Sequence, residues 1–251
     1  MIIMHRIATV ILSLILLLSG GNAIYADNIF RKIARIGTTS EKQKSDSINA
    51  QKDTGKKAKK EKKSKEAVTT DPFELSLDEN LVVPAVNDKL KPVIADYMNE
   101  VAKKLAQRKI ARIETMRGGE VVVATISSDL LFAPNDTVLR STAPEILSPY
   151  RSLLSRGLYK FVLTCHTDNT GSTPYTDRLS EARVNAVDSW LSRTLPADIV
   201  LVPYALGAAE PLHPNDSQTH RAANRRIEIF IVPTEGLIDL AKSGKLSNGA
   251  R

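Results

Sequence analysis

Cysteine is almost absent from this sequence, and its absence limits the covalent chemistry open to the chain. The 251 residues contain one cysteine, Cys165, so no disulfide can form within the chain. No cysteine lies directly after the apolar run near the N-terminus, and we therefore expect no cysteine-linked lipid anchor there. Cys165 itself is predicted to be a small buried residue. A nucleophile activated by His166 is the disfavoured alternative, because adjacent strand residues point to opposite faces.

The sequence also lacks the histidine spacing that metal sites use. Its four histidines, His5, His166, His213 and His220, form no cluster of ligands. We predict no metal or other cofactor. His166 is interpreted as a packing or hydrogen-bonding residue at the end of a strand.

Long hydrophobic runs are missing as well. The apolar run at 7–18 is well short of the roughly 20 residues that span a bilayer. It follows His5 and Arg6 and precedes small residues, which is the layout of a secretory signal cleaved after Ala23 or Ala26. We therefore expect export to the periplasm, with a retained membrane anchor as the alternative.

Positive charge is confined to one segment. Residues 31–66 contain 13 Lys or Arg against 5 Asp or Glu, whereas residues 67–251 contain 21 against 22. The segment 42–65 is too polar to form a core and is predicted to be an extended linker. It is interpreted as a spacer, or as a segment attracted to anionic membrane or lipopolysaccharide. Nucleic acid is disfavoured as a partner, because the segment follows a secretory signal and lacks interleaved aromatic residues.

The remaining sequence alternates helical and strand patterns, which predicts an α/β sandwich of helices packed on a mixed sheet. We divide the chain into a signal at 1–26, a Lys-rich linker and lead-in at 27–80, a folded domain at 81–234 and a C-terminal tail at 235–251, which contains a possible short helix. Helices are predicted at 92–108, at 143–156 and from Ser180 onward, the last with Thr176 or Asp177 as its N-cap. Strands are predicted at 110–116 and 120–126 as a hairpin, before Cys165, at 199–205 and at 226–232. The segment 207–224 is predicted to be a surface loop.

The segment 164–183, T-C-H-T-D-N-T-G-S-T-P-Y-T-D-R-L-S-E-A-R, is the most informative part of the chain. It places Asp168 where a strand ends and Arg183 in the first turns of the following helix. A carboxylate accepts hydrogen bonds from an ammonium group, and a guanidinium binds a carboxylate through two parallel hydrogen bonds. The pair therefore suits a ligand that carries both charges on one carbon. A structural salt bridge is the alternative.

Three motifs in this order, H-T-D-N-T-G-S, L-S-E-A-R and A-A-N-R-R-I-E-I, resemble the signature of the OmpA-like peptidoglycan-binding domain, which also occurs in Pal lipoproteins and MotB stator proteins. The resemblance covers about 150 residues, from near Pro84 to Pro233. It implies that Asp168 binds the amine, and Arg183 the carboxylate, of diaminopimelate in the peptide stem.

The resemblance extends to further candidate ligand residues. Thr167 matches a threonine beside the ligand aspartate, and either Arg225 or Arg226 matches the arginines that line the pocket. Two adjacent residues of a strand cannot face the same way, and Arg226 is preferred. Weaker candidates are Asn135 and Asp136, in a loop after an early strand, and Thr176, which stands where the family usually has asparagine.

The function implied is non-catalytic binding of peptidoglycan, which would anchor an envelope component to the cell wall in the periplasm, with the outer membrane as one location. An envelope hydrolase is the alternative from another class, but no nucleophile, base and orienting residue occur at a readable spacing. A wall-anchoring subunit of a larger envelope machine is a narrower variant. The sequence does not indicate the oligomeric state.

Overall fold

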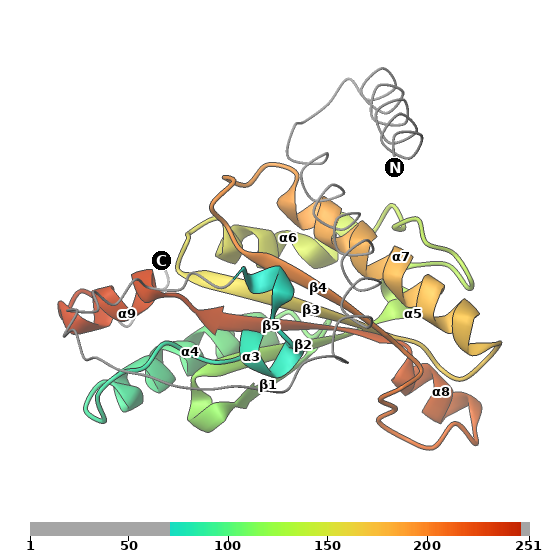
Figure 1. The fold of residues 1–251 in the computed structure, drawn as a ribbon, viewed down its shortest axis with the longest axis horizontal. Coiled ribbons are helices and arrows are strands. Elements are labelled where there is room, and N and C mark those ends of the chain that lie inside the picture. The colour runs from blue at the N-terminus through green and yellow to red at the C-terminus, as the bar shows by residue number, and fades with distance from the viewer. Residues whose placement is uncertain (1–70, 247–251) are drawn as a thin grey trace, which may run out of the picture. The chain divides into compact units, whose positions relative to one another are not determined.

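The computed structural model describes residues 71–246, which contain a five-stranded mixed sheet in the order β1-β2-β5-β3-β4 (Figure 1). The strands are β1 (Arg112–Met116), β2 (Val121–Ser127), β3 (Tyr159–His166), β4 (Leu201–Gly207) and β5 (Arg226–Pro233). Neighbouring strands are antiparallel except β3 and β4, which are parallel. The predicted fold class is confirmed. The predicted signal segment and most of the predicted linker lie outside the described residues.

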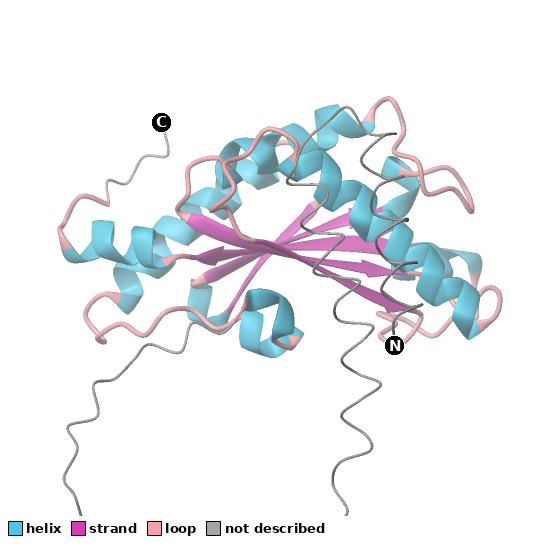
Figure 2. Ribbon diagram, turned by 45° about the horizontal axis from the view of Figure 1, so that its top comes forward, coloured by secondary structure: helices cyan, strands magenta, loops and turns pink. Residues whose placement is uncertain are grey.

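The longer helices cover one face of the sheet (Figure 2). They are α4 (Lys91–Ala106), α6 (Ala143–Leu154), α7 (Thr173–Ser192) and α9 (Glu235–Lys242). Alternate strand residues such as Ile126, Leu163 and Ile229 point toward these helices and are fully buried with them in one core. This alternation follows from the two-residue period of a strand. No helix in the described range has the length and apolar character needed to cross a membrane.

The predicted elements are found, with one helix boundary corrected. The hairpin of β1 and β2 is closed by the short helix η2 (Arg117–Gly119), in which both glycines have positive φ. The helix α7 begins at Thr173 with Ser172 as its N-cap, so the prediction that Thr176 or Asp177 caps it is wrong. Pro174 lies in the first turn, where its fixed φ fits a helix and its missing N–H has no partner to lose. Arg183 consequently lies in the middle of α7 rather than in its first turns.

The segment predicted to be a surface loop contains a helix, α8 (Gln218–Asn224). Ser217 caps it by accepting a hydrogen bond from the N–H of His220 at 3.1 Å. The rest of the loop is held by Asn224, whose side chain is fully buried and bonds both backbone groups of His213. A short polar helix of this kind has no apolar stripe, and its pattern is therefore hidden in the sequence.

A lead-in covers part of the opposite face of the sheet. It contains η1 (Pro72–Glu74) and α3 (Leu77–Asn80), and it packs Leu81 against Val162 and Phe230. Buried Asn80 donates to the Tyr204 hydroxyl at 2.7 Å, and that hydroxyl donates to the carbonyl of Leu75 at 2.7 Å. The lead-in, which precedes the predicted domain at 81–234, therefore packs on the sheet of that domain.

Replacing Tyr204 with phenylalanine is expected to loosen this lead-in. The change leaves the ring in place but removes one donor and one acceptor, so Asn80 loses one of its bonds and keeps those to the Pro72 carbonyl and Lys160. Loss of a buried hydrogen bond costs about 1 to 3 kcal/mol of unfolding free energy. Urea unfolding followed by circular dichroism measures this cost, and an unfolding free energy equal to that of the parent would contradict the attachment.

Candidate functional site

The candidate site lies where three strand ends meet. Ser127 at the end of β2 and His166 at the end of β3 are both register partners of Arg226, the first residue of β5. The segments beyond these ends are α5 (Ser128–Leu131), the loop at 167–172 and α8. Figure 1 shows α5 and α8 beyond the same end of the sheet. The topology therefore gathers Asp129, Asp168 and Arg225 at one place.

Arg225 joins two carboxylates from different parts of the chain. Its Nε and Nη2 donate to the two oxygens of Asp129 at 3.1 and 2.7 Å, and its Nη1 donates to Oδ2 of Asp168 at 2.8 Å. These bonds raise the pKa of Arg225, with the pair to Asp129 contributing most. One guanidinium thus bridges Asp129 and Asp168.

Asp168 is a buried carboxylate that remains ionised. Its residue is 7% exposed. Burial by itself would raise the pKa, but hydrogen bonds from Arg225 and from the backbone N–H of Thr170, at 2.9 Å to Oδ1, lower it below its ordinary value. A hydrogen bond from the Thr170 side chain lowers this pKa as well, and the carboxylate, which can accept about four hydrogen bonds, keeps acceptor capacity for another donor. The carboxylate can therefore still accept hydrogen bonds from a cationic ligand.

Arg183 has no carboxylate partner among residues 71–246. Its Nε donates to the carbonyl of Asp136 at 2.9 Å and its Nη2 to the carbonyl of Ala133 at 3.2 Å. The guanidinium lies over the ring of Phe132, with its carbon 5.1 Å from the ring centre. Burial lowers the pKa of Arg183, which is only 3% exposed. A buried guanidinium held by neutral partners is a favourable site for an anion.

The two principal candidates are therefore not paired with each other. Asp168 is paired with Arg225, and Arg183 binds only carbonyls and a ring. The alternative of a structural salt bridge between Asp168 and Arg183 is not what the structure contains. The charges of Asp129 and Arg225 nevertheless act on Arg183, which places Arg183 near the ion pair that Arg225 makes with Asp129.

The geometry places Arg225, and not the preferred Arg226, against Asp168. Arg226 is buried, donates through Nε to Glu228 at 2.8 Å and bonds the carbonyl of Glu210. Arg225 precedes the strand and reaches Asp168 instead. Adjacent residues at a strand entry diverge, and only the tertiary structure shows which one meets the carboxylate.

The weaker candidates line the rim or support the backbone. Thr167 donates its N–H to the carbonyl of Gly207 at 2.8 Å and its hydroxyl to the carbonyl of Asp168 at 2.9 Å, so it fixes the backbone at Asp168. Asn135 accepts from the Tyr175 hydroxyl at 3.1 Å.

Two further candidates use their side chains locally. The Asp136 carboxylate accepts from the N–H groups of Thr137 and Val138, and these bonds lower its pKa. The buried Thr176 hydroxyl donates to the carbonyl of Thr173 within α7. Asp136 therefore meets Arg183 through its backbone carbonyl, and Thr176 stabilises the first turn of α7. Their roles as ligand residues remain predictions.

Comparison with known proteins agrees with this arrangement. A sequence profile of the OmpA family matches residues 131–225, a range that includes Asp168, Arg183 and Arg225. The lipoprotein YfiB of Escherichia coli (strain K12) is 33% identical over 108 residues, which are 42% of this chain and 68% of that protein. The chain belongs to the OmpA family.

Two further similarities were found. The outer-membrane lipoprotein YfiB of Pseudomonas aeruginosa is 35% identical over 112 residues, which are 44% of this chain and 66% of that protein. A MotB-like protein from Desulfovibrio vulgaris superposes with a TM-score of 0.50 at 23% identity, covering 58% of this chain and 94% of the other. The structural similarity concerns the fold, and it agrees with the sheet and helices described above.

Sequence reasoning missed Asp129 and Phe132 as members of the site. Asp129 lies just outside the range that matches the OmpA family, in a short helix whose four residues show no periodicity. The available signal was a carboxylate directly after a strand, in S-S-D-L-L-F. That signal says nothing about a partner 96 residues away in sequence.

A second polar cluster lies in the sheet beside the site, and its geometry does not suit hydrolysis. The hydroxyl of Thr164 and the carboxylate of Glu228 both meet Nε2 of His166, at 3.0 and 3.3 Å, while its buried Nδ1 has no partner. A hydrolytic triad places the hydroxyl and the carboxylate on opposite ring nitrogens. Thr164 is also fully buried.

The remaining nucleophile candidate, Cys165, is also unsuited to catalysis. Cys165 is fully buried, and burial raises the pKa of its thiol to about 12. The thiol is therefore neutral at physiological pH, whereas the thiolate is the reactive form. Its interpretation as a buried apolar residue agrees with the core around it.

Glu228 is expected to make folding stability depend on acid pH. Burial raises its pKa, but bonds from His166 and Arg226 lower it from 4.5 to about 2. Because the folded pKa is the lower one, the stabilisation is complete above pH 4.5 and is lost as pH falls toward 2. The shift corresponds to about 3 kcal/mol. Urea unfolding at pH 7 and pH 3 measures this effect. The unfolding free energy of Glu228→Gln should change much less between the two pH values than that of the parent, whereas the exposed control Glu145→Gln should behave like the parent.

Proposed function

We propose that this protein binds peptidoglycan without catalysis, through the diaminopimelate of its peptide stem, and that this binding anchors an envelope component to the cell wall. The observation that carries the proposal is Arg183, a buried guanidinium without a carboxylate partner among the described residues. Its Nη1 makes no hydrogen bond to a described residue. Among the described residues, the fully buried side-chain atoms without a partner are Ser128 Oγ and His166 Nδ1, so Nη1 of Arg183 is not fully buried. The free N–H groups of Arg183 therefore keep some access to a ligand.

The ligand chemistry follows from the charges around that guanidinium. The free end of diaminopimelate carries an ammonium and a carboxylate on one carbon. The ligand carboxylate would accept a hydrogen bond from Nη1 of Arg183, and the ligand ammonium would donate a hydrogen bond to the Asp168 carboxylate. The bonds that Arg183 makes to the 133–136 loop fix its guanidinium before the ligand arrives, which lowers the entropy lost on binding.

Membership of the OmpA family and similarity to an outer-membrane lipoprotein support placement in the periplasm at the cell wall. Attraction of the Lys-rich segment to anionic membrane or lipopolysaccharide remains a prediction, since residues 42–65 lie outside the described part of the chain. A cleaved signal at 1–26 likewise remains a prediction.

Calorimetric titration of the purified chain with a stem peptide tests the proposal. We expect saturable binding to a peptide that contains diaminopimelate, and much weaker binding to the same peptide with lysine in that position. Lysine lacks the carboxylate that Arg183 would bind. Equal binding to both peptides would place recognition elsewhere in the stem, and no binding to either would refute the proposed function.

A further inference from the structure

The strand β1 ends the sheet among residues 71–246, and no described strand pairs with its outer edge. An exposed edge presents unpaired backbone N–H and C=O groups, which pair readily with another strand. Lys109 and Arg117, on either side of the strand, have φ of 56° and 52°. This left-handed backbone ends the extended conformation, so an added strand could pair with about the length of β1 itself.

The side chains of β1 favour one pairing of the strand with itself. In an antiparallel pair, residues directly opposite share a face, and opposite charges there are favourable. A pair centred on Arg112 or on Glu114 would bring two like charges together. A pair centred on Ile113 places Arg112 of each copy opposite Glu114 of the other. These two side chains are exposed and already bond each other at 2.6 Å within the strand.

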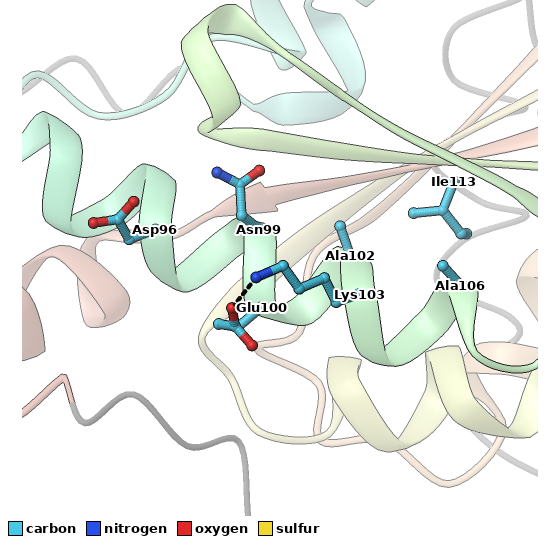
Figure 3. A pocket seen from close by; sticks show the side chains of 7 residues that line it. All are labelled: Asp96, Asn99, Glu100, Ala102, Lys103, Ala106 and Ile113. Carbon is cyan, nitrogen blue, oxygen red and sulfur yellow. Dashed lines mark hydrogen bonds and ion pairs between the residues drawn. The ribbon is translucent and has the colours of Figure 1, made fainter.

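A hollow lies beside this edge. It has a volume of about 590 Å³ and lies between α4 and Ile113 (Figure 3). Figure 3 shows Ala102 and Ala106 of α4 near Ile113, and Asp96, Glu100 and Lys103 farther along the helix. The lining therefore combines apolar residues with charged residues of both signs. A lining that carries both signs can place opposite charges together when it faces a second copy of itself.

We propose that two copies of this chain associate through β1, antiparallel and centred on Ile113, so that their sheets join across a two-fold axis. The Ile113 side chains of the two copies would meet at the axis, on the face that carries α4. The partner's α4 would lie along the hollow, and Lys103 of one copy would face the acidic residues of the other. This association is independent of the proposed wall binding, because the Asp168 site uses none of these residues.

Sedimentation velocity of the full chain over a range of concentrations tests the proposal. We expect a concentration-dependent dimer. Arg112→Glu and Glu114→Arg should each raise the dimer dissociation constant about tenfold or more, because each converts two attractive cross-strand pairs into two repulsive ones. The double variant Arg112→Glu with Glu114→Arg restores opposite charges across the axis, and its dimer should match that of the parent.

Glu145→Lys is the control, since it reverses one exposed charge on α6, a helix that packs on α7 and β3 and not on β1, and should leave the dimer unchanged. A monomer at every concentration would overturn the proposal and leave the edge open to a segment of another protein. A dimer that both single reversals leave intact would also overturn it, because the copies would then meet through another surface. Neither result would bear on binding of the stem peptide.

Discussion

Replacing Arg183 with alanine is expected to weaken binding of the diaminopimelate stem by about 2 to 4 kcal/mol, or roughly 30- to 700-fold. The substitution removes the only described cation of the site that has no carboxylate partner, and the ligand carboxylate then enters a partly buried place without a counter-charge. Calorimetry with the stem peptide measures the loss directly. Pull-down of the variant with purified cell wall gives an independent reading.

Two companion variants separate charge from geometry. Arg183→Lys keeps the positive charge but cannot present two parallel N–H donors, and we expect an intermediate loss. Arg151 is the matched control, because its guanidinium also lies over an aromatic ring, at 3.9 Å from the centre of Trp190, but on α6. Wild-type binding by Arg183→Ala, or equal losses for Arg183→Ala and Arg151→Ala, would contradict the assignment. Circular dichroism must show the same helix content in all three variants.

The second large effect is expected for Asp168→Asn. The change is nearly isosteric and removes the charge that would bind the ligand ammonium, so we expect a loss of about 2 to 4 kcal/mol in affinity. The fold should survive, because Arg225 keeps its two bonds to Asp129. The same calorimetric titration measures the loss, and Asp168→Asn with parental affinity would exclude this carboxylate from the site.

Asp129→Asn is the matched comparison for that variant, since both carboxylates bind Arg225. Asp129 is exposed, and its role would be to share the positive charge of Arg225. Its loss leaves Asp168 as the only carboxylate bonded to that guanidinium, which should make Asp168 less available to an ammonium group. We expect a smaller loss of affinity than for Asp168→Asn. A larger loss would indicate that Asp129, and not Asp168, binds the ammonium group.

The affinity should also be nearly independent of pH through the mildly acidic range. The folded pKa of Asp168 lies below its ordinary value of 3.8, and the carboxylate therefore stays ionised until the pH falls below that value. Titrations at pH 5 and pH 7 should agree. A loss of binding between them would require another titrating group at the site.

Much of the fold was predictable because its elements are long and periodic. The stripe of Ile94, Tyr97, Val101 and Leu105 predicts α4, and all four residues are buried. The alternation of Ile227, Ile229 and Ile231 predicts β5 in the same way. Short or polar elements, such as α5 and α8, carry no such period and were missed. The start of α7 was placed too late because Ser172 and Pro174 determine it locally, ahead of the apolar pattern.

The sequence by itself indicated most of the charged residues of the candidate site, since Asp168, Arg183 and Arg225 are evident in its motifs, whereas Asp129 is not. Only the tertiary structure decided their partners. Pairing between Arg225, Asp129 and Asp168 depends on three strand ends meeting at one edge of the sheet, over separations of 57 and 96 residues. Local patterns record the direction of a side chain along its own element, whereas the position of one element against another is set by packing across the whole core.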